Sequence, residues 1–323
     1  MRPWHGLIHT LKAGQPAILV IVTESTGSAP GRAGFKMIVD KLGRQAGTIG
    51  GGIMEARIIE KCQEMLAEKR TANQLLLQVH NEQADGELRS GMICAGSQRI
   101  LLQPVQDKDL DLLNLLDKAE ETARPKELVI SPQGMRLTEL DAKDTAPTQF
   151  RQTEPGNWTY REIVGRRETF YIAGGGHVGL ALSQALSPLG FHIVVFDHRP
   201  ELDTFTANPF AHQKIVCGYQ AIGKHVLQGM QSYVAVVTAT FQSDMAALNS
   251  VIHHRLKYLG LMGSKAKVRR IFSGLKAQGI PKDLLQKVTA PMGIPIGNRT
   301  PAEIAVSIAA QVVAVRNSEE TDR

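Results

Sequence analysis

The chain lacks several features that would mark a specialised class of protein. Its 323 residues include only three cysteines, an odd and widely spaced set that excludes a disulfide framework and fits a reducing compartment. Aromatic residues make up 5% of the chain, and no apolar run approaches the roughly 20 residues of a membrane-spanning helix. The first residues do not form the basic and apolar segments of a secretory signal. We therefore expect a cytoplasmic protein without a membrane partner.

The charge balance is modest, with a formal net charge of +6 at pH 7. A basic cluster occupies 265–270, but no aromatic residues interleave with it, so we expect no nucleic-acid partner. The ten histidines show no spacing typical of a zinc site, so we expect no metal ligands. This balance favours a small anionic ligand or an acidic protein partner.

The most informative segment is a glycine-rich turn at 174–179, with the pattern G-x-G-x-x-G. An apolar strand precedes it, an apolar-faced helix follows, and a second strand ends on Asp197. This order of elements is typical of a dinucleotide-binding Rossmann unit, in which Gly174 turns the chain, Gly176 approaches phosphate and Gly179 packs helix on strand. We therefore expect these three glycines and Asp197 to bind a nucleotide, with NAD(P) as one candidate, or the phosphate end of another cofactor.

About half of the chain precedes this unit, so a second domain is needed. We predict an α/β protein with an N-terminal mixed α/β domain at 1–130 and a C-terminal Rossmann-like domain with a parallel sheet at 166–316. Turn-forming and charged residues dominate the segment between them, which we expect to be a linker or strap over 131–165. Residues 317–323 form a tail.

Two further glycine-rich turns precede predicted helices. Gly50, Gly51 and Gly52 open a helix whose first turn carries Glu55, and Gly263, Ser264 and Lys265 open a basic helix. Helix N-termini present unpaired N–H groups to anions, and a lysine adds a charge, although glycines also simply permit tight turns. Glu55 is a candidate ligand contact, although an acid in a first turn also suits the helix dipole.

Cys94 is the most interesting single residue, because it lies in an irregular stretch between Gly91 and Gly96. A deprotonated thiol there would be a soft metal ligand, a sulfur carrier or a nucleophile. The alternative is a small buried hydrophobic residue, the role we expect for Cys62 and Cys217.

Near the C-terminus, Thr300, Pro301 and Glu303 form the pattern of a capping box with proline at the first helical position. The apolar residues that follow at helical spacing predict a structural helix.

Together these segments resemble the xanthine dehydrogenase accessory proteins of the XdhC/CoxI family. The resemblance covers essentially the whole chain and its motifs occur in order: 26–30, 47–52 with Glu55, 92–96, 173–179, 197–201, 258–264 and 291–310.

The resemblance implies a protein that binds the molybdenum cofactor, helps it receive a sulfido ligand from a cysteine desulfurase, and delivers it to a xanthine dehydrogenase-type hydroxylase. It implies that Ser28, Gly50–Gly52, Glu55, Cys94 and Gly96 lie at the cofactor site. Apolar faces along the chain further suggest a homodimer.

The chain departs from the family pattern at two places. Ile53 stands where many members carry a cysteine, and Ala239 and Phe241 stand where many carry histidines. The loss of two imidazoles favours a carrier over a catalyst. Because Ile53 replaces the other cysteine, Cys94 remains the only motif cysteine.

An NAD-dependent oxidoreductase is the main alternative, since Asp197 would then bind ribose hydroxyls, with His198 and Arg199 softening the preference against a 2′-phosphate. A methyltransferase is a poorer alternative. The sequence presents no partner group for hydride transfer, and a stoichiometric NAD complex would favour the oxidoreductase.

Overall fold

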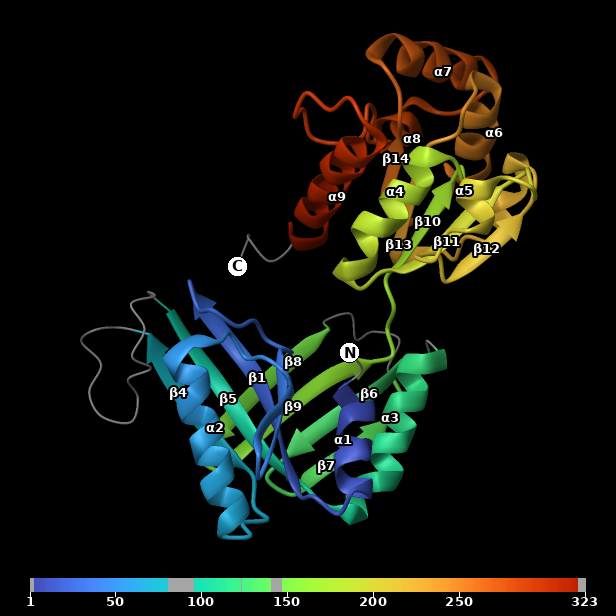
Figure 1. The fold of residues 1–323 in the computed structure, drawn as a ribbon. Helices are drawn as coiled ribbons and strands as arrows, with labels where there is room; N and C mark the ends of the chain where they lie inside the picture. The colour runs from blue at the N-terminus through green and yellow to red at the C-terminus, as the bar shows by residue number, and fades with distance from the viewer. Residues whose placement is uncertain (1–2, 81–95, 123, 141–146, 319–323) are drawn as a thin grey trace. The chain divides into compact units, whose positions relative to one another are not determined.

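The structure, a computed structural model, describes residues 3–80, 96–122, 124–140 and 147–318. The chain divides into two compact units, Met1–Arg166 (unit 1) and Arg167–Arg323 (unit 2) (Figure 1). Unit 1 contains antiparallel sheets and unit 2 a parallel sheet, which confirms the predicted α/β class and the Rossmann-like second half.

Among the described residues, unit 1 holds a five-stranded antiparallel sheet in the order β3-β2-β1-β5-β4. The central strand β1 begins with six fully buried apolar residues, 17–22, so both faces of the sheet must be covered. Helix α2 covers one face, while α1, α3 and a four-stranded antiparallel sheet, β7-β6-β9-β8, pack on the other (Figure 1). The elements of unit 1 are α1 (Pro3–Lys12), β1 (Ala17–Gly27), β2 (Lys36–Asp40), β3 (Gly43–Gly47), α2 (Gly52–Ala67), β4 (Gln74–His80), β5 (Gly96–Val105), η2 (Asp107–Asp109), α3 (Leu110–Thr122), β6 (Lys126–Ser131), β7 (Gly134–Thr138), β8 (Thr148–Glu154) and β9 (Asn157–Val164).

The linker expected at 131–165 is instead part of unit 1. Strands β7, β8 and β9 fill most of it, and the boundary between the units follows Arg166. The physical reason is that one face of this small sheet is polar and exposed, so β8 has a half-buried and exposed pattern that looks like a loop in the sequence. Among the described residues of 131–165 the buried apolar ones are few, namely Trp158, Tyr160 and Val164 on β9.

Unit 2 is doubly wound around a five-stranded parallel sheet in the order β12-β11-β10-β13-β14. Alternate residues of β10 point to opposite faces: Phe170 and Ile172 pack with α4 and α9, and Tyr171 and Ala173 pack with α6 and α7. The elements of unit 2 are β10 (Thr169–Ala173), α4 (His177–Leu186), η3 (Ser187–Leu189), β11 (His192–Asp197), α5 (Asp203–Thr206), β12 (Gln213–Val216), η4 (Tyr219–Lys224), β13 (Gly229–Val236), α6 (Phe241–Val251), β14 (Leu256–Leu261), α7 (Lys265–Ala277), α8 (Lys282–Gln286) and α9 (Pro301–Asn317).

The strand order places a topological switch point between β10 and β13. From β10 the chain runs outward to β11 and β12 on one side, then returns to β13 and β14 on the other. Ligands of such sheets bind outside the carboxyl ends of the strands at this point. The glycine-rich turn at 174–179 lies there, directly after β10.

The capping box predicted at the last helix is confirmed. The Thr300 hydroxyl accepts from the Glu303 N–H, and the Glu303 carboxylate accepts from the Thr300 N–H, with Pro301 as the first residue of α9. Helix α1, which the interpretation of the sequence overlooked, buries Trp4, Leu7, Ile8 and Leu11, an i, i+3, i+4, i+7 pattern that was available in the sequence.

Candidate functional site

Three segments that carry motifs in the sequence meet at one end of the unit 1 sheet. The last residue of β1, Gly27, pairs with the first residue of β5, Gly96. A Cβ added to Gly96 would lie 2.4 Å from the carbonyl oxygen of Thr26, and one added to Gly31 would lie 2.2 Å from the carbonyl oxygen of Ile49. These backbones approach so closely that no side chain fits between them, which explains glycine at both positions.

The turn at Gly50–Gly52 is held from within by Glu55. All three glycines have positive φ, and a Cβ on Gly50 would lie 2.9 Å from the Gly31 nitrogen. The Glu55 carboxylate accepts from the Thr48 hydroxyl at 2.5 Å and from the N–H groups of Ile49 and Gly51 at 2.9 and 3.0 Å. The N–H groups of Ile49 and Gly51 therefore already bind an anionic group of the chain itself, the Glu55 carboxylate.

The charge on Glu55 is stabilised by these contacts. Burial raises the pKa of the Glu55 carboxyl, but the hydrogen bonds from Thr48, Ile49 and Gly51, with Arg44 nearby, outweigh burial and hold the pKa below its ordinary value. Glu55 therefore remains ionised and ties the turn to the first turn of α2.

The outer side of the same turn is open. Among the described residues, no atom lies within 4 Å of a Cβ added to Gly51, Ser28 is exposed, and Ile53 is 58% exposed. No side chain of the described residues caps the N-terminus of α2, so its first N–H groups have no side-chain acceptor there. The structure thus brings the predicted Ser28, Gly96 and Gly50–Gly52 together. Cys94 lies outside the described residues, two positions before Gly96.

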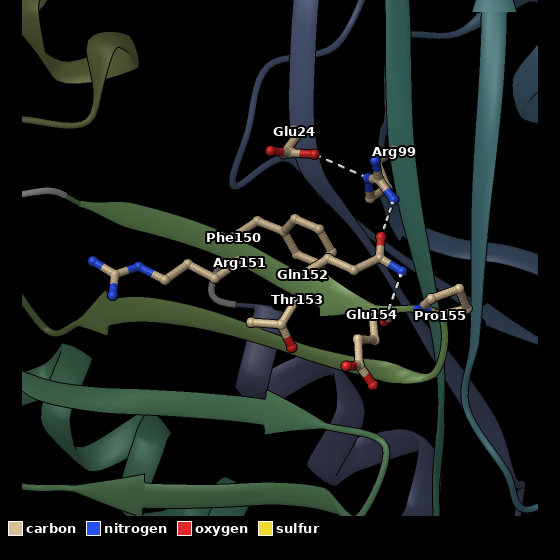
Figure 2. A pocket seen from close by; sticks show the side chains of 8 residues that line it. All are labelled: Glu24, Arg99, Phe150, Arg151, Gln152, Thr153, Glu154 and Pro155. Atoms are coloured by element: carbon tan, nitrogen blue, oxygen red, sulfur yellow. Dashed lines mark hydrogen bonds and ion pairs between the residues drawn. The ribbon is translucent and has the colours of Figure 1, made fainter.

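A groove next to this cluster was not foreseen from the sequence. It has a volume of about 730 Å³ and lies between the ends of β1 and β5 and the edge strand β8 (Figure 2). The Arg99 Nε donates to Glu24 at 2.9 Å and its Nη1 donates to Gln152 at 2.7 Å, while its guanidinium lies 5.0 Å from the centre of the Phe150 ring. No local signal marks these residues, because they are distant in sequence and only the sheet pairing brings them together.

The register connects the groove to the motif cluster. Glu24 pairs with Arg99, and two residues further along Thr26 pairs with Ser97, so both pairs lie on the same face of the sheet. The Thr26 and Ser97 hydroxyls lie 2.8 Å apart and are exposed. Gln98 points to the opposite face, where it is buried and donates to the carbonyl oxygen of Ile49.

In unit 2, the glycine-rich turn has two structural glycines and an open one. A Cβ on Gly174 would lie 2.7 Å from the Val237 carbonyl oxygen, and one on Gly179 would lie 2.0 Å from the Gly174 carbonyl oxygen. In the part of the chain that the structure describes, no atom lies within 4 Å of a Cβ added to Gly176, the residue before α4. The N-terminus of α4 is therefore open at Gly176, as an anion site requires.

The acid predicted to bind ribose is occupied by the chain itself. Asp197 is fully buried, and its carboxylate accepts from the Gly175 N–H at 2.8 Å and the Tyr219 hydroxyl at 3.0 Å. It also accepts from the backbone N–H and the guanidinium of Arg199, at 2.9–3.0 Å. Burial raises the pKa of the Asp197 carboxyl, but the bonds from Arg199, Gly175 and Tyr219 hold the pKa well below its ordinary value.

The turn is also covered by a short segment after β11. The Thr204 hydroxyl of α5 donates to the Gly175 carbonyl oxygen at 2.7 Å, and a Cβ on Gly175 would lie 2.7 Å from the Phe205 ring. A dinucleotide bound in the usual way would need the Asp197 carboxylate for its ribose. Here that carboxylate and Gly175 are engaged by the protein.

At the third predicted turn, Gly263–Lys265, the lysine that pairs with another described residue is Lys267 and not the predicted Lys265. Ser264 caps α7, and Lys265 is exposed. Lys267 instead pairs with the fully buried Asp244, which also accepts from the Thr238 hydroxyl at 2.5 Å. Burial raises the pKa of the Asp244 carboxyl, and the contacts with Lys267 and Thr238 only partly oppose this. The sequence already placed Lys267 in the first turn of this helix, three residues after the capping Ser264.

Within the described ranges, no group of three or more histidine, cysteine or acidic side chains is arranged to hold a metal ion. A separate search of the same residues finds no helix long and apolar enough to cross a membrane.

The described cysteines have raised thiol pKa values. Burial raises the pKa of the Cys62 thiol to about 12, and burial also raises the pKa of the Cys217 thiol. Neither is a thiolate at neutral pH, which agrees with the structural role predicted for both.

Comparison with known proteins places this geometry in a family. A model of the XdhC and CoxI family matches residues 10–79, and a model of the XdhC Rossmann domain matches residues 170–312. The chain is 24% identical to a protein of Bacillus subtilis (strain 168) named as a probable xanthine dehydrogenase subunit, over 98% of each protein. It is also 24% identical to the molybdenum cofactor insertion chaperone PaoD of Escherichia coli (strain K12), over 98% of this chain and 88% of PaoD.

Two further similarities complete the comparison. The chain is 24% identical to the uncharacterized protein YqeB of Escherichia coli (strain K12) over 94% of its own length, but it spans only 44% of YqeB. The fold matches a crystal structure described as a xanthine dehydrogenase from Bacillus halodurans, with a TM-score of 0.76 and 24% identity over 98% of this chain and 96% of that one. The family models match both units in order, so the chain belongs to the XdhC and CoxI family, with the XdhC Rossmann domain as its C-terminal half.

Proposed function

We propose that this chain is an accessory protein that binds the molybdenum cofactor, shields it while it receives its sulfido ligand, and inserts it into a xanthine dehydrogenase-type hydroxylase. The observation that carries the proposal is the meeting of the segments at 26–31, 49–52 and 96–98 at one end of the unit 1 sheet. The printed names of two relatives, a molybdenum cofactor insertion chaperone and a probable xanthine dehydrogenase subunit, support it.

In this proposal the cofactor is cargo, held by groups of unit 1. The Ser28 hydroxyl and the open N–H groups at the start of α2 suit its phosphate, since a helix N-terminus favours anions. Glu55 keeps the turn in shape, and Gly96 permits the close approach of β5 to the turn after β1. Cys94 supplies a soft thiolate for molybdenum or for the incoming sulfur.

We assign sulfur transfer itself to a partner cysteine desulfurase and treat this chain as a carrier. Ala239 and Phe241 stand where the family resemblance implies imidazoles, so that position offers no acid–base pair. We do not propose an NAD-dependent oxidoreductase, because Asp197 is fully buried and accepts hydrogen bonds from Gly175, Arg199 and Tyr219. In unit 2 two turns remain our candidates for the phosphate end of a ligand: the Gly176 end of α4 and the turn at Gly263–Lys265, which follows β14, two strands away from β10.

The first experiment measures what the chain carries. The protein is purified without oxygen from a host that makes molybdenum cofactor, and molybdenum and the fluorescent oxidised pterin are assayed against protein. We expect near-stoichiometric pterin in the unchanged chain, loss of it in Cys94→Ala, and retention in Cys217→Ala, which removes a half-buried thiol of unit 2.

The two failures have different meanings. If the unchanged chain carries no pterin and does not activate an apo-hydroxylase supplied with cofactor, the proposed function is wrong. If Cys94→Ala carries pterin and activates as well as the unchanged chain, the function stands and the role of Cys94 is wrong.

A further inference from the structure

The groove of unit 1 combines a flat face with charged groups of both signs. The Arg99 guanidinium lies over the Phe150 ring, 5.0 Å from its centre, and the same ring stacks on Trp158, whose centre is 6.2 Å away. The Glu24 carboxylate and the Gln152 amide oxygen each accept a hydrogen bond from Arg99 (Figure 2). Side chains of this kind suit a planar heterocycle, which stacks on aromatic rings and guanidinium planes and is identified by hydrogen bonds along its edge.

The polar groups specify what that edge must offer. A carboxylate only accepts hydrogen bonds, so Glu24 calls for two adjacent donors, such as an amino group beside a ring N–H. The Arg99 guanidinium only donates hydrogen bonds, so its partner on the ligand must be an acceptor such as a carbonyl oxygen or a ring nitrogen. The Gln152 amide can both donate and accept. A 2-amino-4-oxo-pyrimidine edge carries this set of donors and acceptors.

The groups in the groove can be redirected to a ligand at little cost. The Arg99 side chain is 27% exposed and the Glu24 side chain 45%, so their ion pair competes with water already. Pairs with this exposure contribute little to stability. Glu24 can therefore exchange Arg99 for the donors of a ligand.

The groove lies in line with the motif cluster. From Glu24 and Arg99 the same face of the sheet leads to the Thr26–Ser97 pair, roughly 7 Å along the strands, and then to the turn after β1. A ligand with its ring in the groove would therefore extend along this face toward the turn after β1, where the Ser28 hydroxyl is exposed.

We propose that this groove binds the pterin ring of the cofactor, with Glu24 accepting from the 2-amino group and ring N–H, Arg99 donating to the opposite acceptors, and Phe150 stacking on the ring. The proposal rests on the proposed function and names the part of the cofactor that unit 1 recognises. It uses side chains that lie outside the sequence motifs of the family.

The test is a fluorescence titration of the full chain with three probes. Pterin carries the complete edge, lumazine replaces the 2-amino group with an oxygen, and guanosine carries the same edge on a purine. The unchanged chain is expected to bind pterin about tenfold more tightly than lumazine, since one hydrogen bond to a charged acceptor is lost. Guanosine tests the second source of the same edge.

Variants then assign the preference to residues. Glu24→Gln is expected to abolish the pterin-over-lumazine preference, and Phe150→Leu to weaken both probes alike. Arg151→Gln is the matched control within the groove, because Arg151 also lines it but its side chain points away from Glu24 and Arg99 (Figure 2). Circular dichroism and thermal melts confirm that each variant is folded.

Each outcome bears on the proposal. Equal affinity for pterin and lumazine, or tighter binding of guanosine than of pterin, overturns it. If free pterin does not bind measurably, the pterin that co-purifies with the chain decides: its loss from Glu24→Gln and Phe150→Leu, but not from Arg151→Gln, supports the proposal, and its retention in all three overturns it. The proposed function fails separately, when the unchanged chain carries no pterin.

Discussion

Replacing Asp197 with asparagine is expected to destabilise unit 2 by about 3 kcal/mol at pH 7. Asparagine keeps the shape of the side chain but leaves Arg199 without its counter-charge, and its amide N–H₂ faces N–H and O–H donors. Removing one member of a buried ion pair costs about 3–5 kcal/mol. The low end applies, because the Arg199 side chain is 42% exposed and regains water. For a unit of this size the loss lowers Tm by roughly 6–12 °C.

The effect has a defined pH dependence. The folded-state pKa of Asp197 lies below its value of about 3.9 in an unfolded chain, so its stabilising effect is complete above that value and is lost as pH falls toward the folded pKa. The difference between the unchanged chain and Asp197→Asn is therefore expected to shrink by about 1 kcal/mol between pH 7 and pH 3.

Thermal unfolding followed by two signals measures this change. Both tryptophans, Trp4 and Trp158, lie in unit 1, so tryptophan emission follows unit 1 while calorimetry and far-UV circular dichroism also follow unit 2. Tyr219→Phe, which removes one donor, is expected to lose about 1.5 kcal/mol and to combine less than additively with Asp197→Asn. An unchanged unit 2 transition in Asp197→Asn, or an equal loss at pH 3 and pH 7, would refute this reasoning.

Three further predictions follow from the same geometry. Gly179→Ala is expected to lower the free energy of unfolding of unit 2 by about 2–3 kcal/mol, because its Cβ would lie 2.0 Å from the Gly174 carbonyl oxygen. Gly176→Ala, whose Cβ meets no described atom, is expected to change this free energy by under about 0.5 kcal/mol, and calorimetry compares the two variants. Glu55→Gln is expected to lower the free energy of unfolding of unit 1 by about 2 kcal/mol at pH 7. The loss is smaller at low pH, because the pKa of the Glu55 carboxyl is lowered in the folded chain and its stabilising effect fades as pH falls below about 4. Urea unfolding followed by tryptophan emission measures both values. Calorimetric titration with NAD is expected to show no micromolar binding, and a stoichiometric complex would show that Asp197 exchanges its partners for ribose.

Local patterns were sufficient for much of unit 2. The strand, glycine-rich turn, helix and acid at 169–197 occur as predicted, because each depends on neighbouring residues and their backbone conformations. The capping box at Thr300 was predictable for the same reason. The partners of Asp197 were not, since Tyr219 comes from η4, beyond β12, and reaches the carboxylate only after the sheet has formed.

In unit 1, local sequence patterns were less informative than tertiary contacts. Its motifs at 26–31 and 47–52 stand out in the sequence, yet their meeting with β5 depends on strand pairing between residues about 70 positions apart. The strands at 134–164 were interpreted as linker because a small sheet with an exposed face needs few apolar residues. The role of Cys94 stays a prediction.

By itself the sequence determined the two-part α/β organisation, the Rossmann turn and the family resemblance, because these follow from local conformation and from motifs in a fixed order. Tertiary structure alone decided which donors occupy Asp197, which backbones exclude a side chain at Gly31 and Gly96, and that Glu24, Arg99 and Phe150 line one groove. The physical reason is that strand register and packing bring distant residues within hydrogen-bond range, and no local pattern encodes that distance.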